Sequence, residues 1–120
     1  MRRSFTTALL VTLAGCATTP PAPHESGVVS GHLVMAPRMQ VFIACQAEEP
    51  LWVVADDALR ERLETRYAEL VDEPGEEAFA RVRGSVGPAL DCQWCRDFPG
   101  SFRLEEVLEY REASAEDDCH

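Results

Sequence analysis

The 120-residue sequence contains no lysine, so its eleven basic residues are all arginine, and twenty-one Asp and Glu outnumber them. The formal net charge is −10 at pH 7. Because proteins bind phosphate backbones through basic side chains that neutralise them, this balance disfavours non-specific binding of nucleic acid. An acidic surface suits basic partners or cations better, and it also keeps a protein soluble.

The sequence also lacks the motifs of common enzyme classes. It has no recognisable motif of a Ser-His-Asp catalytic triad, no phosphate-binding loop and no metal-hydrolase motif. Adjacent acid pairs such as Glu48-Glu49 and Glu105-Glu106 are expected to be solvated faces or helix caps, and not acid/base dyads. We therefore predict a protein that is not an enzyme and has no cofactor.

No apolar run is long enough to cross a bilayer. The longest, Phe5 to Leu13, has nine residues, whereas a spanning helix needs about twenty. It follows Arg2 and Arg3 and ends in Leu13-Ala14-Gly15-Cys16. A basic start, a short apolar stretch and small residues before a cleavage point are the features of a secretory signal.

The four residues that end this signal resemble the lipobox of bacterial lipoproteins. That resemblance implies removal of residues 1–15 and lipidation of Cys16, with acyl chains such as palmitate; two or three chains hold a protein firmly to a membrane. Ala17, and not Asp, follows the cysteine, which favours the outer membrane, with the domain facing the periplasm or the cell surface. An ordinary signal peptide with an incidental cysteine is the alternative.

The remaining chain is long enough for one domain. Residues 16–27 contain three prolines and almost nothing to bury, which predicts an extended linker after the lipidated cysteine. The domain is expected at residues 28–112, and residues 113–120 are expected to form an acidic, solvated tail that is held only at Cys119. Loss of Arg2 and Arg3 from the eleven arginines would leave nine against twenty-one acids, a net charge of −12.

Apolar periodicity predicts the elements of this domain. Strand-forming runs, most of them alternating, predict strands within residues 28–35, 39–45, 51–55, 77–86 and 102–110. The helical spacing of Leu59, Leu63, Tyr67 and Leu70 predicts one helix of about four turns, capped by Asp56 or Asp57 and stopped by Pro74-Gly75. Five strands with one helix between the third and fourth is the order of the OB-fold, a small barrel whose helix plugs one end. The alternative is an open α+β sheet with one helix on its face. Trp52 is expected in the core.

Four cysteines remain once Cys16 is assigned to lipid. In an oxidising compartment an even number of thiols favours disulfides, and Cys45, Cys92, Cys95 and Cys119 permit three pairings. The CxxC pair Cys92 and Cys95 lies in the predicted loop at residues 88–100. It could form a structural disulfide, capture a soft metal with Cys119 and His120, or exchange thiols; no helix begins there to activate a thiolate, and no second CxxC completes a zinc site.

An exposed aromatic residue on the same loop is the best candidate for ligand binding. Trp94 lies between the two cysteines, where a flat ring can stack on a ligand, as aromatic residues of OB-folds do.

Several short motifs resemble the OB-type domain of NlpE-like bacterial outer-membrane lipoproteins. They are Gly31-His32-Leu33-Val34, Phe42-Ile43-Ala44-Cys45, Leu51-Trp52-Val53-Val54, Tyr67, Arg83-Gly84-Ser85-Val86 and the late Cys119. The resemblance implies a non-enzymatic envelope protein associated with copper and surface-stress sensing, and a disulfide between Cys45 and Cys119. The chain lacks the family's separate amino-terminal barrel with its own CxxC.

These observations predict a membrane-tethered envelope lipoprotein. It would act as a binding or structural module, with a role in the envelope stress response, and contact another envelope protein or a cell-wall component. The alternative is a copper, zinc or thiol-redox sensor that uses the CxxC loop.

Overall fold

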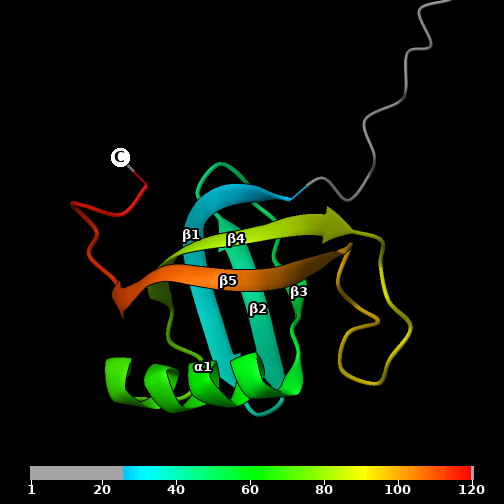
Figure 1. Cartoon of the computed structure of the whole chain (residues 1–120), viewed down its shortest axis with the longest axis horizontal. Helices are drawn as coiled ribbons and strands as arrows, with labels where there is room; N and C mark the ends of the chain where they lie inside the picture. The colour runs from blue at the N-terminus through cyan, green and yellow to red at the C-terminus, as the bar shows by residue number, and fades with distance from the viewer. Residues whose placement is uncertain (1–25, 120) are drawn as a thin grey trace, which may run out of the picture.

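The computed structural model describes residues 26–119 (Figure 1). In chain order the elements are β1 (Gly27–Ala36), β2 (Met39–Ala44), β3 (Leu51–Val54), α1 (Asp57–Leu70), β4 (Ala78–Gly87) and β5 (Ser101–Glu112). The predicted signal segment, Cys16, the linker up to residue 25 and His120 lie outside the described residues. Within residues 26–119, no helix has the length and apolar character that a membrane span needs.

The five strands close into a barrel in the order β1-β2-β3-β5-β4, with β4 paired back to β1. All neighbouring strands are antiparallel except β3 and β5, which run parallel. The helix α1 lies across the lower end of the barrel in Figure 1. The predicted OB-like barrel is therefore confirmed, and the alternative of an open sheet with a helix on one face is wrong.

The helix is fixed at both ends by hydrogen bonds. The Asp56 carboxylate accepts from the backbone nitrogen of Leu59 at 2.8 Å, which satisfies a donor at the helix start. Near its end, the Tyr67 hydroxyl donates to the Glu76 carbonyl at 2.7 Å and accepts from the Gly75 nitrogen at 2.8 Å. These bonds tie the connection to β4 against the helix. The face turned to the barrel buries Leu59, Leu63 and Tyr67.

Strand β5 carries two extra residues, Glu105 and Leu108, that have no partner on β4. Each one shifts the alternation, so Val107 packs against the core between the buried residues Leu104 and Tyr110. Simple alternation from Phe102 would place Leu108 on this face and would leave Glu106 as a charged interruption of it. The structure explains the interruption: β-bulges leave an unpaired residue and re-aim the side chains that follow.

The end of β4 also departs from the prediction. Simple alternation along β4 would place Val86 on the same face as the buried residues Ala80 and Val82, and Ser85 on the opposite face, but Val86 is 56% exposed and Ser85 is buried. The reason is that β1 pairs with β4 only as far as Gly84. Val86 therefore lies beyond the closed part of the barrel.

Candidate functional site

The loop of residues 88–100, termed the Trp94 loop, joins β4 to β5 and is stapled by a disulfide between Cys92 and Cys95. The backbone nitrogen of Cys92 donates to Cys95 Sγ at 3.0 Å, and the nitrogen of Phe98 donates to the Cys95 carbonyl at 3.1 Å. Cys95 is fully buried. Of the three uses that the sequence left open for this CxxC, the structure contains the disulfide.

The side chain of Trp94, between the two bridged cysteines, is 50% exposed. Its ring lies beneath the Arg38 guanidinium, whose carbon is 5.4 Å from the ring centroid. Arg38 belongs to the tight turn between β1 and β2, so closure of the barrel brings two distant loops together. A guanidinium over an indole face is attracted by the ring quadrupole, by about 0.5–1 kcal/mol at an exposed position.

Trp52 lies beneath the same loop and not in the core, so that prediction is wrong. Side chains alternate along β3, and it is Val53 that points into the barrel and is fully buried. The half-buried Trp52 ring faces Phe98, with 5.6 Å between the ring centroids. The Trp94 loop is therefore packed onto β3 through its own Phe98.

The position of Trp94 and Arg38 corresponds to the place where OB-folds bind ligands. In these barrels the loops between strands 1 and 2 and between strands 4 and 5 flank the binding face. Trp94 was a candidate from the sequence, and the structure puts it at that place. Arg38 was missed, because nothing local in the sequence signals which turn lies beside the loop.

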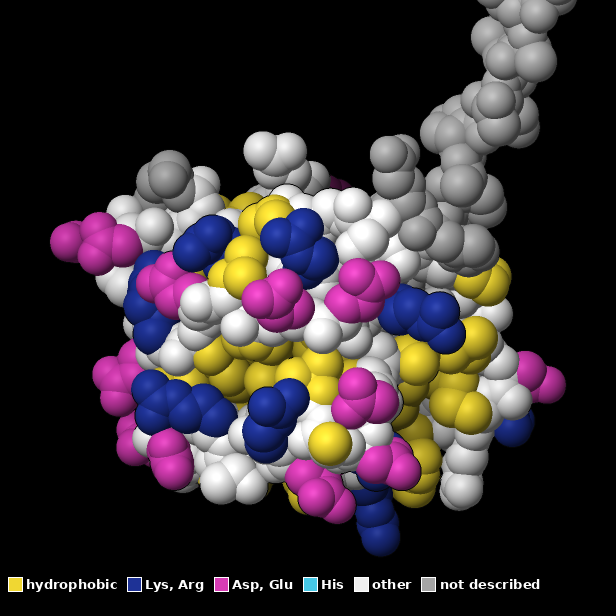
Figure 2. All heavy atoms as spheres, in the orientation of Figure 1, with side chains coloured by type: hydrophobic (Ala, Val, Ile, Leu, Met, Phe, Trp, Pro, Cys, Tyr) yellow, Lys and Arg dark blue, Asp and Glu magenta, His cyan; other side chains and the backbone are white. Residues whose placement is uncertain are grey.

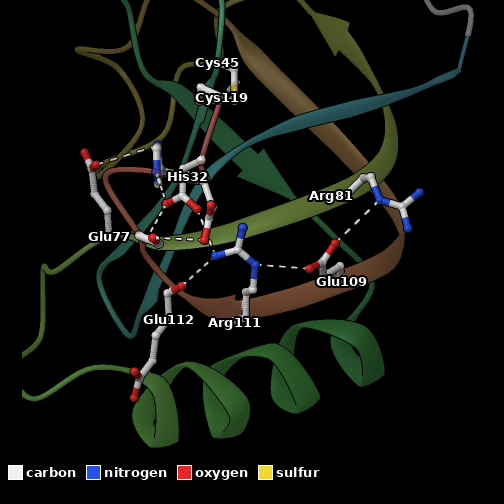
Figure 3. Close-up of polar contacts among 11 residues, drawn as sticks. His32, Cys45, Glu77, Arg81, Glu109, Arg111, Glu112 and Cys119 are labelled. Carbon is white, nitrogen blue, oxygen red and sulfur yellow. Dashed lines mark hydrogen bonds and ion pairs between the residues drawn. A yellow bond between two sulfur atoms is a disulfide. The ribbon is translucent and has the colours of Figure 1, made fainter.

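A second cluster surrounds the C-terminal segment, residues 113–119 (Figure 3). A disulfide joins Cys45, after β2, to Cys119, with 5.1 Å between their Cα atoms. This is the pairing that the resemblance to NlpE-like lipoproteins implied. The segment was expected to be a solvated tail held by one cysteine, but it also buries Asp118.

Two side chains and one backbone nitrogen contact the Asp118 carboxylate, and the Asp118 side chain is only 4% exposed. His32 Nε2 lies 3.0 Å from Oδ2, the backbone nitrogen of Ser114 donates to the same oxygen at 2.8 Å, and Arg111 Nη1 lies 2.9 Å from Oδ1. Burial opposes ionisation of Asp118. The bonds from His32, Ser114 and Arg111 outweigh it and hold the pKa of this carboxyl below its usual range.

The imidazole of His32 lies between two carboxylates, because Glu77 Oε2 is 4.0 Å from Nδ1 on the other side of the ring. Its ring also meets Phe79 edge-on, at 6.2 Å between centroids, and the Arg111 guanidinium lies 4.2 Å above that Phe79 ring. Every member of this cluster has a structural partner. These contacts hold the C-terminal segment against the wall of the barrel.

The predicted metal ligands do not come together. Cys92 and Cys95 lie in the Trp94 loop at the right of Figure 1, and Cys119 lies near the chain end at the left. All three sulfur atoms are bonded in disulfides. Among residues 26–119 no group of three or more His, Cys, Asp or Glu is arranged to hold a metal ion. The fourth candidate, His120, lies outside the described residues.

The outer face of β4 and β5 is a ladder of paired charges. Arg81 lies 3.8 Å from Glu109, and Arg83 lies 3.4 Å from Glu106, each pair directly opposite across the two strands. Figure 2 shows basic and acidic side chains interspersed on this face. Such cross-strand pairs stabilise a sheet modestly. They leave no patch of one sign on this face for a charged partner.

Replacing Asp118 by Asn should destabilise the protein at pH 7 by about 2 kcal/mol, because hydrogen bonds to a buried charged group are lost. A carboxyl whose pKa is lowered by folding stabilises the fold above its unfolded value, here 3.8, and this contribution is lost as the pH falls through the folded pKa. The two proteins should therefore converge in melting temperature below that pH. Asp117→Asn, at the exposed neighbour, is the control; a pH-independent difference for Asp118→Asn would contradict the assignment.

Comparison with protein-family models, with curated proteins and with solved structures finds no match to this chain. The resemblance to NlpE-like lipoproteins therefore stays a prediction from short motifs. The function has to be argued from the barrel, its disulfides and the surface around Trp94.

Proposed function

We propose that this protein is a lipid-anchored lipoprotein of the bacterial outer membrane whose barrel serves as a non-enzymatic binding module. The observation that carries the proposal is that all four cysteines within residues 26–119 are paired in disulfides. Disulfides persist in oxidising compartments and are rare where thiols are kept reduced. This agrees with the secretory signal and the lipobox at Cys16 that the sequence predicts.

The surface around Trp94 supports binding as the activity of the module. A half-exposed tryptophan beside an arginine, held on a stapled loop, is a rigid contact surface of the kind that recognition sites use. The NlpE-like motifs extend the proposal to the envelope stress response. The alternative of a metal or thiol sensor has less support, because Cys92 and Cys95 offer no thiolate until their bridge is reduced.

The tether can be tested by expressing the full chain in a bacterium with an outer membrane. We expect a membrane-bound product that begins at Cys16 and carries acyl chains, detected by mass spectrometry of the N-terminal peptide. Cys16→Ser should move the protein out of the membrane fraction. Ala17→Asp, which keeps the lipidated cysteine but creates an inner-membrane retention signal, is the matched control and should change only the membrane.

The same preparation tests the compartment. Alkylation without reduction should label no cysteine in the barrel, and labelling after reduction should reach Cys45, Cys92, Cys95 and Cys119. A product that retains residues 1–15 with an unmodified Cys16, or barrel cysteines that react without reduction, would overturn the proposal.

A further inference from the structure

We propose that Trp94 and Arg38 together bind an anionic glycan, with a sugar ring stacked on the indole and a carboxylate of the glycan paired with the guanidinium. The inference rests on the proposed function in one respect, since an exported protein meets such polymers in the cell envelope. It goes further by naming the chemistry of the ligand and the two residues that recognise it.

The loop that carries Trp94 is held in a fixed conformation. The loop turns inward at Cys95, which is fully buried, and the Cys92–Cys95 bridge holds the turn closed. Phe98 packs against Trp52 and fixes the far side of the loop. Trp94 is therefore 50% exposed on a constrained turn and not on a flexible one. A ring held in place before binding loses less conformational freedom when a ligand stacks on it.

Arg38 is available to pair with the carboxylate of a ligand. Five of the arginines in residues 26–119 lie within 4.0 Å of a carboxylate, but Arg38 forms no such ion pair with any described residue. Its guanidinium contacts the Trp94 ring. What distinguishes Arg38 is its place beside an exposed aromatic ring, where a guanidinium without an ion pair among the described residues can accept the carboxylate of a ligand that stacks on that ring. The planar guanidinium matches a carboxylate through two parallel hydrogen bonds.

The fold and the net charge of the protein together favour an oligosaccharide as the ligand. Barrels of this type bind oligonucleotides or oligosaccharides between the loops that carry Arg38 and Trp94. Twenty-one acidic residues against eleven arginines disfavour a phosphate polymer with one charge on every nucleotide. An oligosaccharide with widely spaced carboxylates avoids that repulsion. The C–H face of a pyranose ring also fits the electron-rich face of an indole.

The residue that follows Arg38 in the chain is also exposed. Met39 begins β2 and is 44% exposed, although its side chain is apolar. Arg96, on the Trp94 loop, likewise forms no ion pair among the described residues; its Nε donates to the Cys92 carbonyl at 3.4 Å, and its backbone nitrogen donates to the same oxygen at 3.1 Å. The two segments that meet at Trp94 and Arg38 therefore also carry an exposed apolar side chain and a second arginine, which suits a ligand with apolar faces and few charges.

The test is a titration of the full lipidated protein in detergent micelles with two tetrasaccharides of equal length. One alternates N-acetylglucosamine with N-acetylmuramic acid, which carries a lactyl carboxylate. The other is chitotetraose, which has the same backbone without the carboxylate. Calorimetry and tryptophan fluorescence report binding, and melting temperatures confirm that each variant is folded.

We expect the carboxylated tetrasaccharide to bind more tightly, with an affinity that falls as salt is added. Trp94→Ala should weaken both glycans at least about tenfold, the loss of roughly one good aromatic contact. Arg38→Gln should weaken only the carboxylated glycan and bring it to the level of chitotetraose. Arg62→Gln is the matched control, because Arg62 on α1 also has no ion pair within residues 26–119 and should leave both affinities unchanged.

Three results would overturn the inference. They are absence of binding by protein that is correctly lipidated at Cys16, equal affinity of the Trp94→Ala variant, and tighter binding of an oligothymidylate or a proline-rich peptide than of either glycan. Because lipidation is measured separately on the same sample, failure of glycan binding is distinguishable from failure of the tether.

Discussion

Replacing Cys45 and Cys119 together by serine is expected to lower the free energy of unfolding by about 4 kcal/mol. The two residues are 74 positions apart, so their bridge removes a large amount of conformational freedom from the unfolded chain. In the folded state the bridge also holds the C-terminal segment, which places Asp118 against His32 and Arg111. Urea denaturation followed by circular dichroism gives the free energy of both proteins.

The second disulfide supplies the matched control. Cys92 and Cys95 are three residues apart, and closing so short a loop should contribute only about 2 kcal/mol. Cys92→Ser with Cys95→Ser should therefore cost roughly half as much. If the short bridge proved the more stabilising one, or if loss of the long bridge left the denaturation midpoint unchanged, the Cys45–Cys119 bridge would not be the main covalent stabiliser of the fold.

The elements of the barrel were predictable because their signals are local. Leu59, Leu63 and Tyr67 recur at helical spacing, and the helix they predict is α1. Strand alternation failed at two kinds of position. One is the pair of bulges at Glu105 and Leu108, which depend on the partner strand. The other is the strand end at Val86, whose exposure depends on where β1 stops pairing.

The functional surfaces were harder to predict because their residues are distant in sequence. Trp94 stood out as an aromatic residue between cysteines, but its neighbour Arg38 is brought to it only when the barrel closes. Asp118 belonged to a tail that its acidic composition marked as solvated. Its burial depends on His32 from β1 and Arg111 from β5, two strands that do not adjoin each other in the barrel.

Closure of the barrel depends on close packing of its strands at Gly31. Gly31→Ala is therefore expected to destabilise the protein by roughly 3 kcal/mol. Gly31 pairs with Ala44 on β2 and with Ala80 on β4, so it lies in the strand that joins the two sides of the barrel. A Cβ atom there would lie 2.8 Å from both the Ala44 Cα and a ring carbon of Phe42, and it would overlap the carbonyl oxygen of Ile43. Backbone atoms cannot yield as a flexible side chain can.

The same strand provides the control for this substitution. A Cβ atom on Gly27 would meet no atom of residues 26–119 within 4 Å, so Gly27→Ala should change the free energy of unfolding by less than about 0.5 kcal/mol. Equal stability of the two variants would mean that β1 and β2 are not closely packed at Gly31. A large loss at Gly31 alone would mean that close approach of β1 and β2 is required for the barrel to close. Trp94 and Arg38 depend on that closure for their contact, so the Gly31→Ala variant should also weaken glycan binding.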